Sequence, residues 1–356
     1  MGTTLIRCDG SDAIGMGHVQ RCLSLALALR GLDNTPVFVM RRDAAARALV
    51  EKLGFDVHEL ASLAPALGAP LESADCQATC QFALECGADH VVIDHYGVSE
   101  IYLESLVQSV GSVGVIDDLA DRDLTAVDWV LNPNPVAENL PYVVRNTCQR
   151  LLGPQYALLR PSFYEARRRK AGYFGPCQRQ VLITLGGGNN TALAARIIET
   201  LNQNPEPMRI RCVLPGNVDP LGVVGTAATQ SPHMIQLLGH VDDIVEQMLW
   251  ADVSINGAGA TSWELCCLGV PMVLMSLAEN QQLNAAALAQ AGCAINAGDP
   301  KQSATLMKLG ESVAELLDDA GLRAALAVAG QKLVDGNGAR RAAKAIIAQM
   351  PAAVEG

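Results

Sequence analysis

A single histidine stands where a glycine turn runs into a helix-like segment near the start of this chain. In DGSDAIGMGHVQRC, residues 9–22, His18 follows Gly15 and Gly17. Glycines let the backbone turn tightly and come close to a ligand, and the free amides that begin the next helix favour an anionic group such as a diphosphate. The helix dipole disfavours an imidazolium, so His18 can remain neutral and accept a proton as a general base. The alternative is a histidine that caps the helix or packs in the core.

This first turn lacks the third glycine of a dinucleotide-binding turn, because Gln20 stands at that position. A dinucleotide is therefore disfavoured. A second glycine turn, LGGGNN, follows a strand-like run in the second half of the chain. Its amides could contact a substrate, and Asn189 or Asn190 could cap the next helix, although a plain tight turn explains these residues equally well. The three glycines concerned are Gly186, Gly187 and Gly188.

The segment INGAGATSWELCCLGVP, residues 255–271, predicts a strand that ends in small residues and a helix that begins near Thr261. Small residues such as Gly259 allow a ligand to approach, and Glu264 could accept hydrogen bonds from a vicinal diol such as ribose. The alternative is that Glu264 has no ligand and stands near the start of the helix because the helix dipole favours a negative charge there. Polar residues that begin another predicted helix are either part of the same site or simply exposed; they are Asn280, Gln281, Gln282 and Asn284.

Hydrogen-bonding side chains also follow two strand-like runs in the first half of the chain. The run VVIDHYG ends in Asp94, His95 and Tyr96. Because ligands bind at the carboxyl ends of strands in doubly wound sheets, we expect these side chains to contact the substrate. In VIDDLADR, Asp117 and Asp118 could suggest a divalent metal site, but adjacent side chains of a strand point to opposite faces. The prediction for both is a helix-capping and turn role.

The elements that must position these residues alternate in type along the chain. Short apolar runs, typical of strands buried on both faces, alternate with helical patterns, which predicts parallel sheets covered by helices on both sides. Strands are predicted at 5–9, 36–40, 56–60, 90–96, 112–118, 128–133, 180–186, 208–214, 234–238, 252–256 and 271–275. Helices are predicted at 18–30, 43–53, 73–87, 99–109, 190–203, 243–250, 260–268, 281–291, 303–333 and 339–350.

The alternation is interrupted around residues 133–178, where turn residues and a basic, glycine-broken segment indicate a hinge. The predicted fold class is therefore α/β, with two doubly wound, Rossmann-like domains facing a cleft that holds the ligand. The predicted division is an N-terminal domain over 1–160, a linker over 161–178 and a second domain over 179–338. A C-terminal helix and tail over 339–356 are expected to pack back on the first domain.

Composition narrows the classes of function. A formal net charge of −11 argues against a general nucleic-acid binder, which needs clustered Lys and Arg. No apolar run approaches the roughly 20 residues of a membrane-spanning helix, and the first residues do not resemble a signal peptide. The 11 cysteines include no C-x-x-C pair and lie mostly in apolar runs. We therefore expect buried thiols, a reducing cytoplasmic location and no metal site.

Six segments, in chain order, resemble the UDP-sugar hydrolases of pseudaminic acid biosynthesis. They are IRCDGSDAIGMGHVQRCLSLA, VVIDHYGVSE, IDDLADR, LLGPQYALLRPSF, LITLGGGN and INGAGATSWELCCLGVPMVL. The resemblance extends over nearly the whole chain, and G-x-G-H-V-x-R-C is its most specific part. The second half, with AENQQLNAAALAQAG, also resembles the nucleotide domain of the peptidoglycan GlcNAc transferase, which implies a GT-B type fold.

By this resemblance the protein is expected to hydrolyse UDP-2,4-diacetamido-2,4,6-trideoxy-β-L-altropyranose to UDP and the free sugar. The resemblance makes His18 the base that activates the attacking water. It places the UDP contacts in the second domain, at the turn 186–188, the helix start with Thr261 and Glu264, and the segment 280–284. It implies no metal ion and no cofactor.

The family departs from the usual chemistry of glycosyl C–O cleavage, which employs two carboxylates. This sequence likewise shows no obvious carboxylate pair. UDP is a good leaving group, so a general acid is less needed, and amides in the glycine turns can stabilise the departing diphosphate instead.

Two other functions fit the same residues. A glycosyltransferase would bring a hydroxyl acceptor, rather than water, to His18. The acidic first domain shows no apolar and basic membrane patch of the kind that transferases with lipid acceptors carry, which favours the hydrolase. A sugar-nucleotide binding module would retain UDP binding with His18 dispensable. In each case the expected partner is a small UDP-linked sugar, with no nucleic acid and no membrane insertion.

Overall fold

The protein divides into two compact units, each built around one parallel sheet. Its structure is a computed structural model. The residues that the structure describes are 2–11, 14–63, 71, 73–170, 176–186, 190–214, 216, 218–239, 241 and 243–349. Unit 1 comprises Met1–Pro161 and Asn337–Gly356, and unit 2 comprises Ser162–Gly336.

Unit 1 contains a seven-stranded parallel sheet with the strand order β3-β2-β1-β4-β5-β6-β7. The chain runs outward from β1 to β3, returns to place β4 beside β1, and then continues outward in the opposite direction. The winding therefore reverses between β1 and β4, and ligands of doubly wound sheets bind at the carboxyl ends of strands at such a switch point. The strands are β1 Thr3–Cys8, β2 Thr35–Arg42, β3 Asp56–Leu63, β4 His90–Asp94, β5 Ser112–Ile116, β6 Trp129–Asn132 and β7 Gln149–Leu152.

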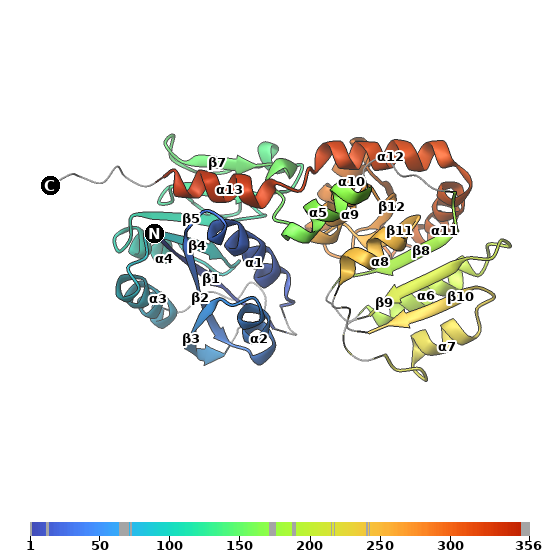
Figure 1. The fold of residues 1–356 in the computed structure, drawn as a ribbon, viewed down its shortest axis with the longest axis horizontal. Helices are drawn as coiled ribbons and strands as arrows, with labels where there is room; N and C mark the ends of the chain where they lie inside the picture. The colour runs from blue at the N-terminus through green and yellow to red at the C-terminus, as the bar shows by residue number, and fades with distance from the viewer. Residues whose placement is uncertain are drawn as a thin grey trace. The chain divides into compact units, whose positions relative to one another are not determined.

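Helices cover both faces of this sheet (Figure 1). One face packs against α1, α2 and α13 through a core that includes Ile6, Phe38 and Trp129, and the other packs against α3 and α4 through a core that includes Val91 and Ile93. Because strand residues alternate between two buried faces, the strands are apolar almost throughout. The helices are α1 Gly17–Arg30, α2 Ala44–Lys52, α3 Ser73–Glu85, α4 Glu100–Val107 and α13 Gly338–Ile347, with short 3-10 turns at Ala137–Asn139 and Pro154–Tyr156.

Unit 2 contains a six-stranded parallel sheet with the order β10-β9-β8-β11-β12-β13, so its winding reverses between β8 and β11. Its core joins the inner strands to α6, α7, α11 and α12. The strands are β8 Gln180–Thr184, β9 Arg209–Val213, β10 Met234–Leu238, β11 Val253–Gly257, β12 Met272–Met275 and β13 Ile295–Gly298. The helices are α5 Pro161–Lys170, α6 Thr191–Leu201, α7 Val223–Thr229, α8 Ile244–Trp250, α9 Ala260–Leu268, α10 Gln281–Gln290, α11 Ser303–Asp318 and α12 Ala320–Leu333.

Helix α13 belongs to unit 1 although it follows unit 2 in the sequence. It lies along α1 and near β7 (Figure 1), and its Ala342 and Ile346 side chains are fully buried in the core beneath α1. Its first residue has to be small, because a Cβ on Gly338 would lie 2.3 Å from the carbonyl oxygen of Ala157. Unit 1 is therefore completed only by the end of the chain.

Two sequence predictions about unit 2 are wrong in detail. The predicted helix 303–333 is two helices, because the extended backbone of Asp319 ends α11 and its carboxylate caps α12 by accepting from the Leu322 amide at 2.8 Å. The predicted linker 161–178 begins with helix α5, whose Phe163 is fully buried and whose Arg167 donates to the carbonyl of Cys267 at 3.2 Å. The sequence indicated a hinge for this basic segment, although one face of α5 is packed.

Candidate active site

The turn before α1 places His18 at the carboxyl ends of the strands of the unit 1 sheet. β1 ends at Cys8, Gly15 adopts φ +78° and donates its amide to the Ser11 carbonyl at 2.8 Å, and α1 then begins at Gly17. A Cβ on either Gly15 or Gly17 would meet no atom within 4 Å, so both glycines border open space. His18 thus lies in the first turn of α1, beside a stretch of backbone that a ligand can approach.

His18 pairs with Asp94 at the switch point of the sheet. Its Nδ1 lies 2.6 Å from Oδ1 of Asp94, the fully buried last residue of β4, and β4 is the neighbour of β1. An ionised carboxylate only accepts hydrogen bonds, so the short contact to Asp94 assigns the imidazole proton to Nδ1, although Nη2 of Arg21 also lies 3.3 Å from this nitrogen. Nε2 is then the nitrogen with a lone pair. A neutral histidine held in this way can accept a proton from a reacting group.

Arg21, one helical turn after His18, holds the same carboxylate from the other side. It donates from Nε to Oδ2 and from Nη2 to Oδ1 of Asp94, each at 2.6 Å, and from Nη1 to Oδ2 of Asp118 at 2.7 Å. The thiol of Cys22 adds a contact of 3.4 Å to Asp94. Burial opposes ionisation of Asp94, but the charge and hydrogen bonds of Arg21 outweigh it and hold the pKa of Asp94 well below its usual value.

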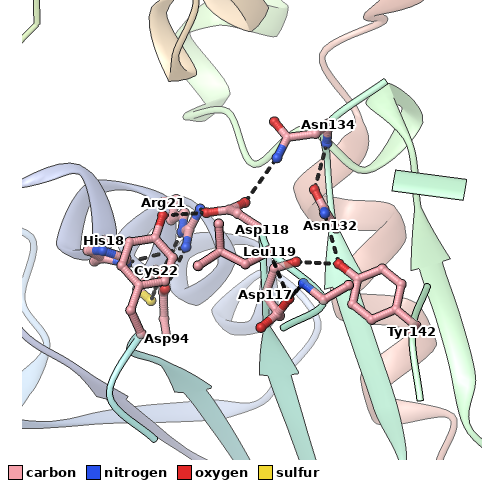
Figure 2. A network of polar contacts seen from close by, with 12 residues as sticks. His18, Arg21, Cys22, Asp94, Asp117, Asp118, Leu119, Asn132, Asn134 and Tyr142 are labelled. Carbon is pink, nitrogen blue, oxygen red and sulfur yellow. Dashed lines mark hydrogen bonds and ion pairs between the residues drawn. The ribbon is translucent and has the colours of Figure 1, made fainter. Parts of the chain in front are cut away.

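Asp118 is the second anchor of Arg21 and joins further residues to the site. Figure 2 shows Arg21 between Asp94 and Asp118, with Asn134 donating to Asp118 at 3.2 Å. The hydroxyl of Tyr96 donates to the same carboxylate at 2.9 Å, and its ring meets that of His18 edge to face at 4.9 Å. Burial and the neighbouring Asp118 raise the pKa of Tyr96, so its hydroxyl remains a donor.

The predicted turn role is right for Asp117 and wrong for Asp118. Asp117 accepts from the Leu119 amide at 3.0 Å and from the Ala120 amide at 2.7 Å, and burial raises its pKa. The next side chain points the other way, toward α1, and pairs with Arg21. Arg21 could be singled out in the sequence because it belongs to G-x-G-H-V-x-R-C. Its contact with Asp118 could not be predicted, because it depends on the strand order.

His95 follows Asp94 directly, yet its ring turns toward the protein interior. Its Nδ1 accepts the Gly97 amide at 2.8 Å, and its Nε2 lies 3.5 Å from Oδ2 of Asp9. Burial, together with the charge of Arg7, lowers the pKa of His95 to about 4. This geometry gives His95 a structural position beneath the site rather than one that faces a ligand.

A buried ionic network, which the sequence analysis missed, supports the end of β1. Arg7 binds Asp9 through two hydrogen bonds, at 2.6 and 2.9 Å, and binds Asp75 of α3 at 2.8 Å. Arg41 of β2 also binds Asp75, at 2.9 Å, and Tyr102 donates to it at 2.8 Å. The available signal was the pair Arg7 and Asp9, two charged residues on one face of the predicted strand 5–9.

The described residues of the second glycine turn lie at the switch point of unit 2. Gly186 adopts φ +80° just after β8, and Asn190 donates to the Leu185 carbonyl at 3.0 Å before α6 begins. Gly187 and Gly188 lie outside the described residues. β8 pairs with β11, so this turn and the loop to α9 leave the same edge of the sheet.

That loop begins α9 at a position without a side-chain cap. Gly259 is the N-cap residue, and half-buried Thr261 and Glu264 follow in the first two turns. Gln281 of α10 accepts the Leu277 amide at 3.0 Å, and its Nε2 would lie 3.4 Å from a Cβ on Gly259. Asn280 is exposed at the start of α10, and Asn284 is buried within the helix. The structure therefore gathers the predicted residues around the amino ends of α9 and α10.

The described residues contain neither a metal-binding cluster nor a membrane-spanning helix. No group of three or more His, Cys, Asp or Glu side chains among them is arranged to hold a metal ion. None of the helices in this part of the chain has both the length and the apolar character needed to cross a bilayer.

Comparison with known proteins adds a family match and a fold. Residues 221–339 match the glycosyltransferase family 28 C-terminal domain. An uncharacterized protein of Methanocaldococcus jannaschii, MJ1062, is 26% identical over 282 residues, which cover 77% of this chain and 55% of that protein. The spore coat polysaccharide biosynthesis protein SpsG of Bacillus subtilis is 26% identical over 189 residues, which cover 52% of this chain and 54% of that protein. The chain spans about half the length of these curated relatives.

Among solved structures, MurG of Acinetobacter baumannii is similar over 98% of this chain and 100% of its own, with a TM-score of 0.68 and 16% identity. At this identity the similarity concerns the fold. Two doubly wound parallel units with such a neighbour are a GT-B type fold, as the sequence analysis predicted.

Proposed function

We propose that this protein is an enzyme that acts on a UDP-linked sugar, and that it hydrolyses the bond between the sugar and UDP. The observation that carries the proposal is the His18–Asp94 pair at the switch point of unit 1, with a separation of 2.6 Å. The family 28 match in unit 2 and the GT-B type fold support a nucleotide-sugar substrate. The SpsG relative, named for polysaccharide biosynthesis, supports a role in making surface sugars.

In the proposed reaction, Nε2 of His18 accepts a proton from water while the water oxygen attacks the anomeric carbon of the sugar. The bond from that carbon to the β-phosphate oxygen breaks, and UDP leaves with the electron pair. Asp94 stays ionised and holds the imidazolium that forms, as a carboxylate does in other histidine-dependent sites. The products are UDP and the free sugar, and His18 returns its proton to solvent.

The charges around His18 suit this step better than they suit a diphosphate. With His18 neutral, Arg21 contributes one positive charge, and Asp94 and Asp118 contribute two negative charges. This excess of negative charge repels an anion but stabilises the positive charge that develops at the anomeric carbon during glycosyl cleavage. We therefore assign the sugar to this site and UDP to unit 2.

In unit 2 the UDP would meet backbone amides near Gly186 and at the start of α9, both at one edge of the sheet. Amides at a helix N-terminus favour phosphate oxygens, and the proposal gives Glu264 of α9 the role of accepting hydrogen bonds from the ribose. The proposed substrate is the UDP-linked 2,4-diacetamido-2,4,6-trideoxy sugar of pseudaminic acid biosynthesis, which the sequence resemblance implies.

A glycosyltransferase is the second candidate, and the family 28 match is the observation that favours it. The same base would then deprotonate a hydroxyl of an acceptor instead of water. The two candidates differ in what reaches His18 and share the sugar and UDP sites.

One experiment separates these candidates. The protein is incubated with a panel of UDP-linked diacetamido and N-acetyl sugars in ¹⁸O-labelled water, and the products are analysed by mass spectrometry. A hydrolase releases UDP without any acceptor, and the label enters the sugar because the carbon–oxygen bond breaks. Label in UDP would contradict attack at the anomeric carbon. Release that requires an added hydroxyl acceptor would identify a transferase, and binding of UDP without turnover would identify a binding module.

A further inference from the structure

We propose that Arg21 is a positioning residue: anchored by Asp118, it fixes Asp94 so that His18 carries its proton on Nδ1 and keeps Nε2 free to accept one. The inference rests on the proposed role of His18 as the base. Arg21 and Cys22 belong to the most specific sequence motif of the chain, yet the reaction as derived above requires neither of them to touch the substrate.

Arg21 fixes the plane of the Asp94 carboxylate. A carboxylate alone can rotate about its last bond and present either oxygen to a histidine. The fork of Arg21 takes both oxygens of Asp94, through Nε and Nη2, at 2.6 Å each. A bidentate pair of this kind fixes the plane of the carboxylate. With that plane fixed, Oδ1 is held at 2.6 Å from Nδ1 of His18.

Arg21 also changes the charge around the Asp94 carboxylate. A buried carboxylate with histidine as its only partner favours the imidazolium, because an opposite charge nearby stabilises the protonated ring. An imidazolium cannot act as a base. The guanidinium of Arg21 places a positive charge directly against Asp94, so the carboxylate that orients His18 is not its only charged partner.

Arg21 is itself kept in position by an ion pair with Asp118. Its remaining nitrogen, Nη1, donates to Asp118 at 2.7 Å, and its side chain is only 16% exposed. Asp118 is kept in place by Tyr96 and Asn134 (Figure 2 shows the second of these contacts). A chain of contacts therefore runs from Asn134, after β6, to His18 of α1. Its links are the carboxylates of Asp118 and Asp94 and the guanidinium between them.

The groups around His18 that carry or can carry charge come from each element that packs against it. Those of α1 are Arg21 and Cys22; those at the end of β4 are Asp94, His95 and Tyr96; and the one at the end of β5 is Asp118. Of these, only Arg21 places a positive charge against Asp94. Replacing Arg21 by lysine therefore tests the orientation of Asp94 while a positive charge is kept nearby.

The test uses R21K and D118N in the full-length protein. Lysine keeps a positive charge but offers a single nitrogen, which cannot replace the fork and the third contact at once. Asparagine at 118 keeps the shape of the anchor and removes its charge. The control is R47K, because Arg47 also bridges two carboxylates, those of Glu51 and Glu59, at 2.8 and 2.9 Å, but lies exposed on the surface. R47K should leave activity and the spectra unchanged.

Two readouts are needed, and one is independent of turnover. Long-range ¹H–¹⁵N NMR of histidine-labelled protein reports which ring nitrogen of His18 carries the proton, with H18N identifying the signal. The second readout is kcat and KM across pH. R21K should move the proton signal away from pure Nδ1–H, lower kcat by about 10²-fold, as a displaced catalytic group does, and shift the acid limb of the pH profile upward. D118N should disturb the proton signal and lower kcat more weakly than R21K, with KM little changed; because it removes a negative charge near His18, it should not shift the acid limb upward.

The results for R21K and D118N distinguish the positioning role of Arg21 from direct binding of the substrate and from failure of the hydrolase proposal. If kcat falls in R21K while the proton on His18 stays on Nδ1 and the acid limb does not move, Arg21 binds the substrate directly and the positioning role is wrong. If the wild-type protein releases UDP from no sugar tested, yet R21K and D118N change the histidine signal, the hydrolase proposal fails and the positioning role stands. If R21K does not fold, D118N, which retains every residue of α1, supplies both readouts.

Discussion

Asp94 is the residue on which the candidate site converges, because it joins the histidine and the arginine of α1 to the end of β4. Its carboxylate accepts from His18, Arg21 and Cys22, and it is fully buried. In the proposed mechanism this carboxylate orients its partners and does not itself react. Its role can therefore be separated from that of His18 by substitution.

We predict that D94N lowers kcat by about 10³–10⁴-fold, because the asparagine amide donates to Nδ1 and moves the histidine proton to Nε2. H18N should lower kcat by at least about 10²-fold, since a positioned base contributes about 10²–10⁴ in rate. Both variants should bind UDP with nearly unchanged affinity in calorimetric titration. Equal loss of UDP binding would instead place these residues in the nucleotide site, and near-parental kcat in H18N would make His18 a helix cap.

His95 offers a prediction about pH at the same scale. Its pKa is lowered to about 4 by burial and by Arg7, from an ordinary value of about 6.5. Below pH 6.5 the unfolded chain binds a proton that the folded protein does not bind until about pH 4, so the free energy of unfolding falls as pH falls between these values. The full loss is on the order of 3 kcal/mol.

H95N tests this, because the asparagine oxygen can still accept the Gly97 amide and cannot titrate in this range. Urea denaturation at pH 7.5, 6.5, 5.5 and 4.5 should show that the wild-type protein loses more stability than H95N as the pH falls. Parallel losses in the two proteins would show that His95 is already protonated in the folded protein or is not coupled to folding.

The residues of this candidate site stand out one by one in the sequence, while their contacts do not. His18, Asp94 and Tyr96 stand beside glycines or at strand ends, which marks them in the sequence. The pairing of His18 with Asp94 spans 76 residues and depends on β4 lying next to β1. Asp118 was assigned to a turn because nothing in VIDDLADR indicates an arginine on a distant helix. Sequence patterns report what a residue type can do, and strand order decides which residue it meets.

At the level of elements, the edge strands β7 and β13 and helix α7 were missed, and helix α5 was taken for part of a linker. β7 and β13 have four residues each and are only partly buried, so neither gives a continuous apolar run, whereas β6 and β12 are equally short but fully buried and were predicted. The longer inner strands were predicted because both of their faces are buried, and their apolar runs are continuous. The division of 303–333 depended on one aspartate, whose capping bond can be seen only when its backbone is known to be extended.

One row of side chains crosses three strands of unit 1 and gives a prediction at this scale. Thr4, His90 and Ser112 are register partners on β1, β4 and β5, all buried on the face covered by α1 and α13. None of their side-chain polar atoms has a hydrogen-bond partner among the described residues. A buried hydroxyl without a partner costs about 1–3 kcal/mol.

T4V removes such a hydroxyl and keeps the shape of the side chain, so we expect the free energy of unfolding to rise by about 1 kcal/mol. The matched control is T79V, since Thr79 is equally buried but hydrogen-bonded to Tyr102 at 2.9 Å. T79V should lower stability by about 1 kcal/mol. Chemical denaturation of both variants measures the difference. Destabilisation of T4V as large as that of T79V would mean that Thr4 is hydrogen-bonded in solution.

For the molecule as a whole, the two units differ in how the chain builds them. Unit 2 is one continuous segment, Ser162–Gly336, with a core of its own. Unit 1 is formed by two segments, and α13 from the second contributes fully buried Ala342, Ala343 and Ile346 to its core. Removing α13 exposes this apolar surface, and each buried aliphatic side chain of this kind contributes about 1–3 kcal/mol.

We therefore predict that residues 162–336, expressed alone, fold cooperatively and bind UDP, whereas residues 1–161 alone are unstable until 337–356 are joined to them. The physical reason for UDP binding is the amide-bearing edge of the unit 2 sheet, with Gly186 after β8 and the uncapped start of α9 after β11. Calorimetric titration of each unit with UDP checks the assignment, with E264A in unit 2 expected to weaken binding through the ribose. UDP binding by the completed unit 1 and not by unit 2 would show that the assignment of UDP to unit 2 is wrong. We expect unit 1 not to bind UDP, because the negative charge around His18 repels a diphosphate.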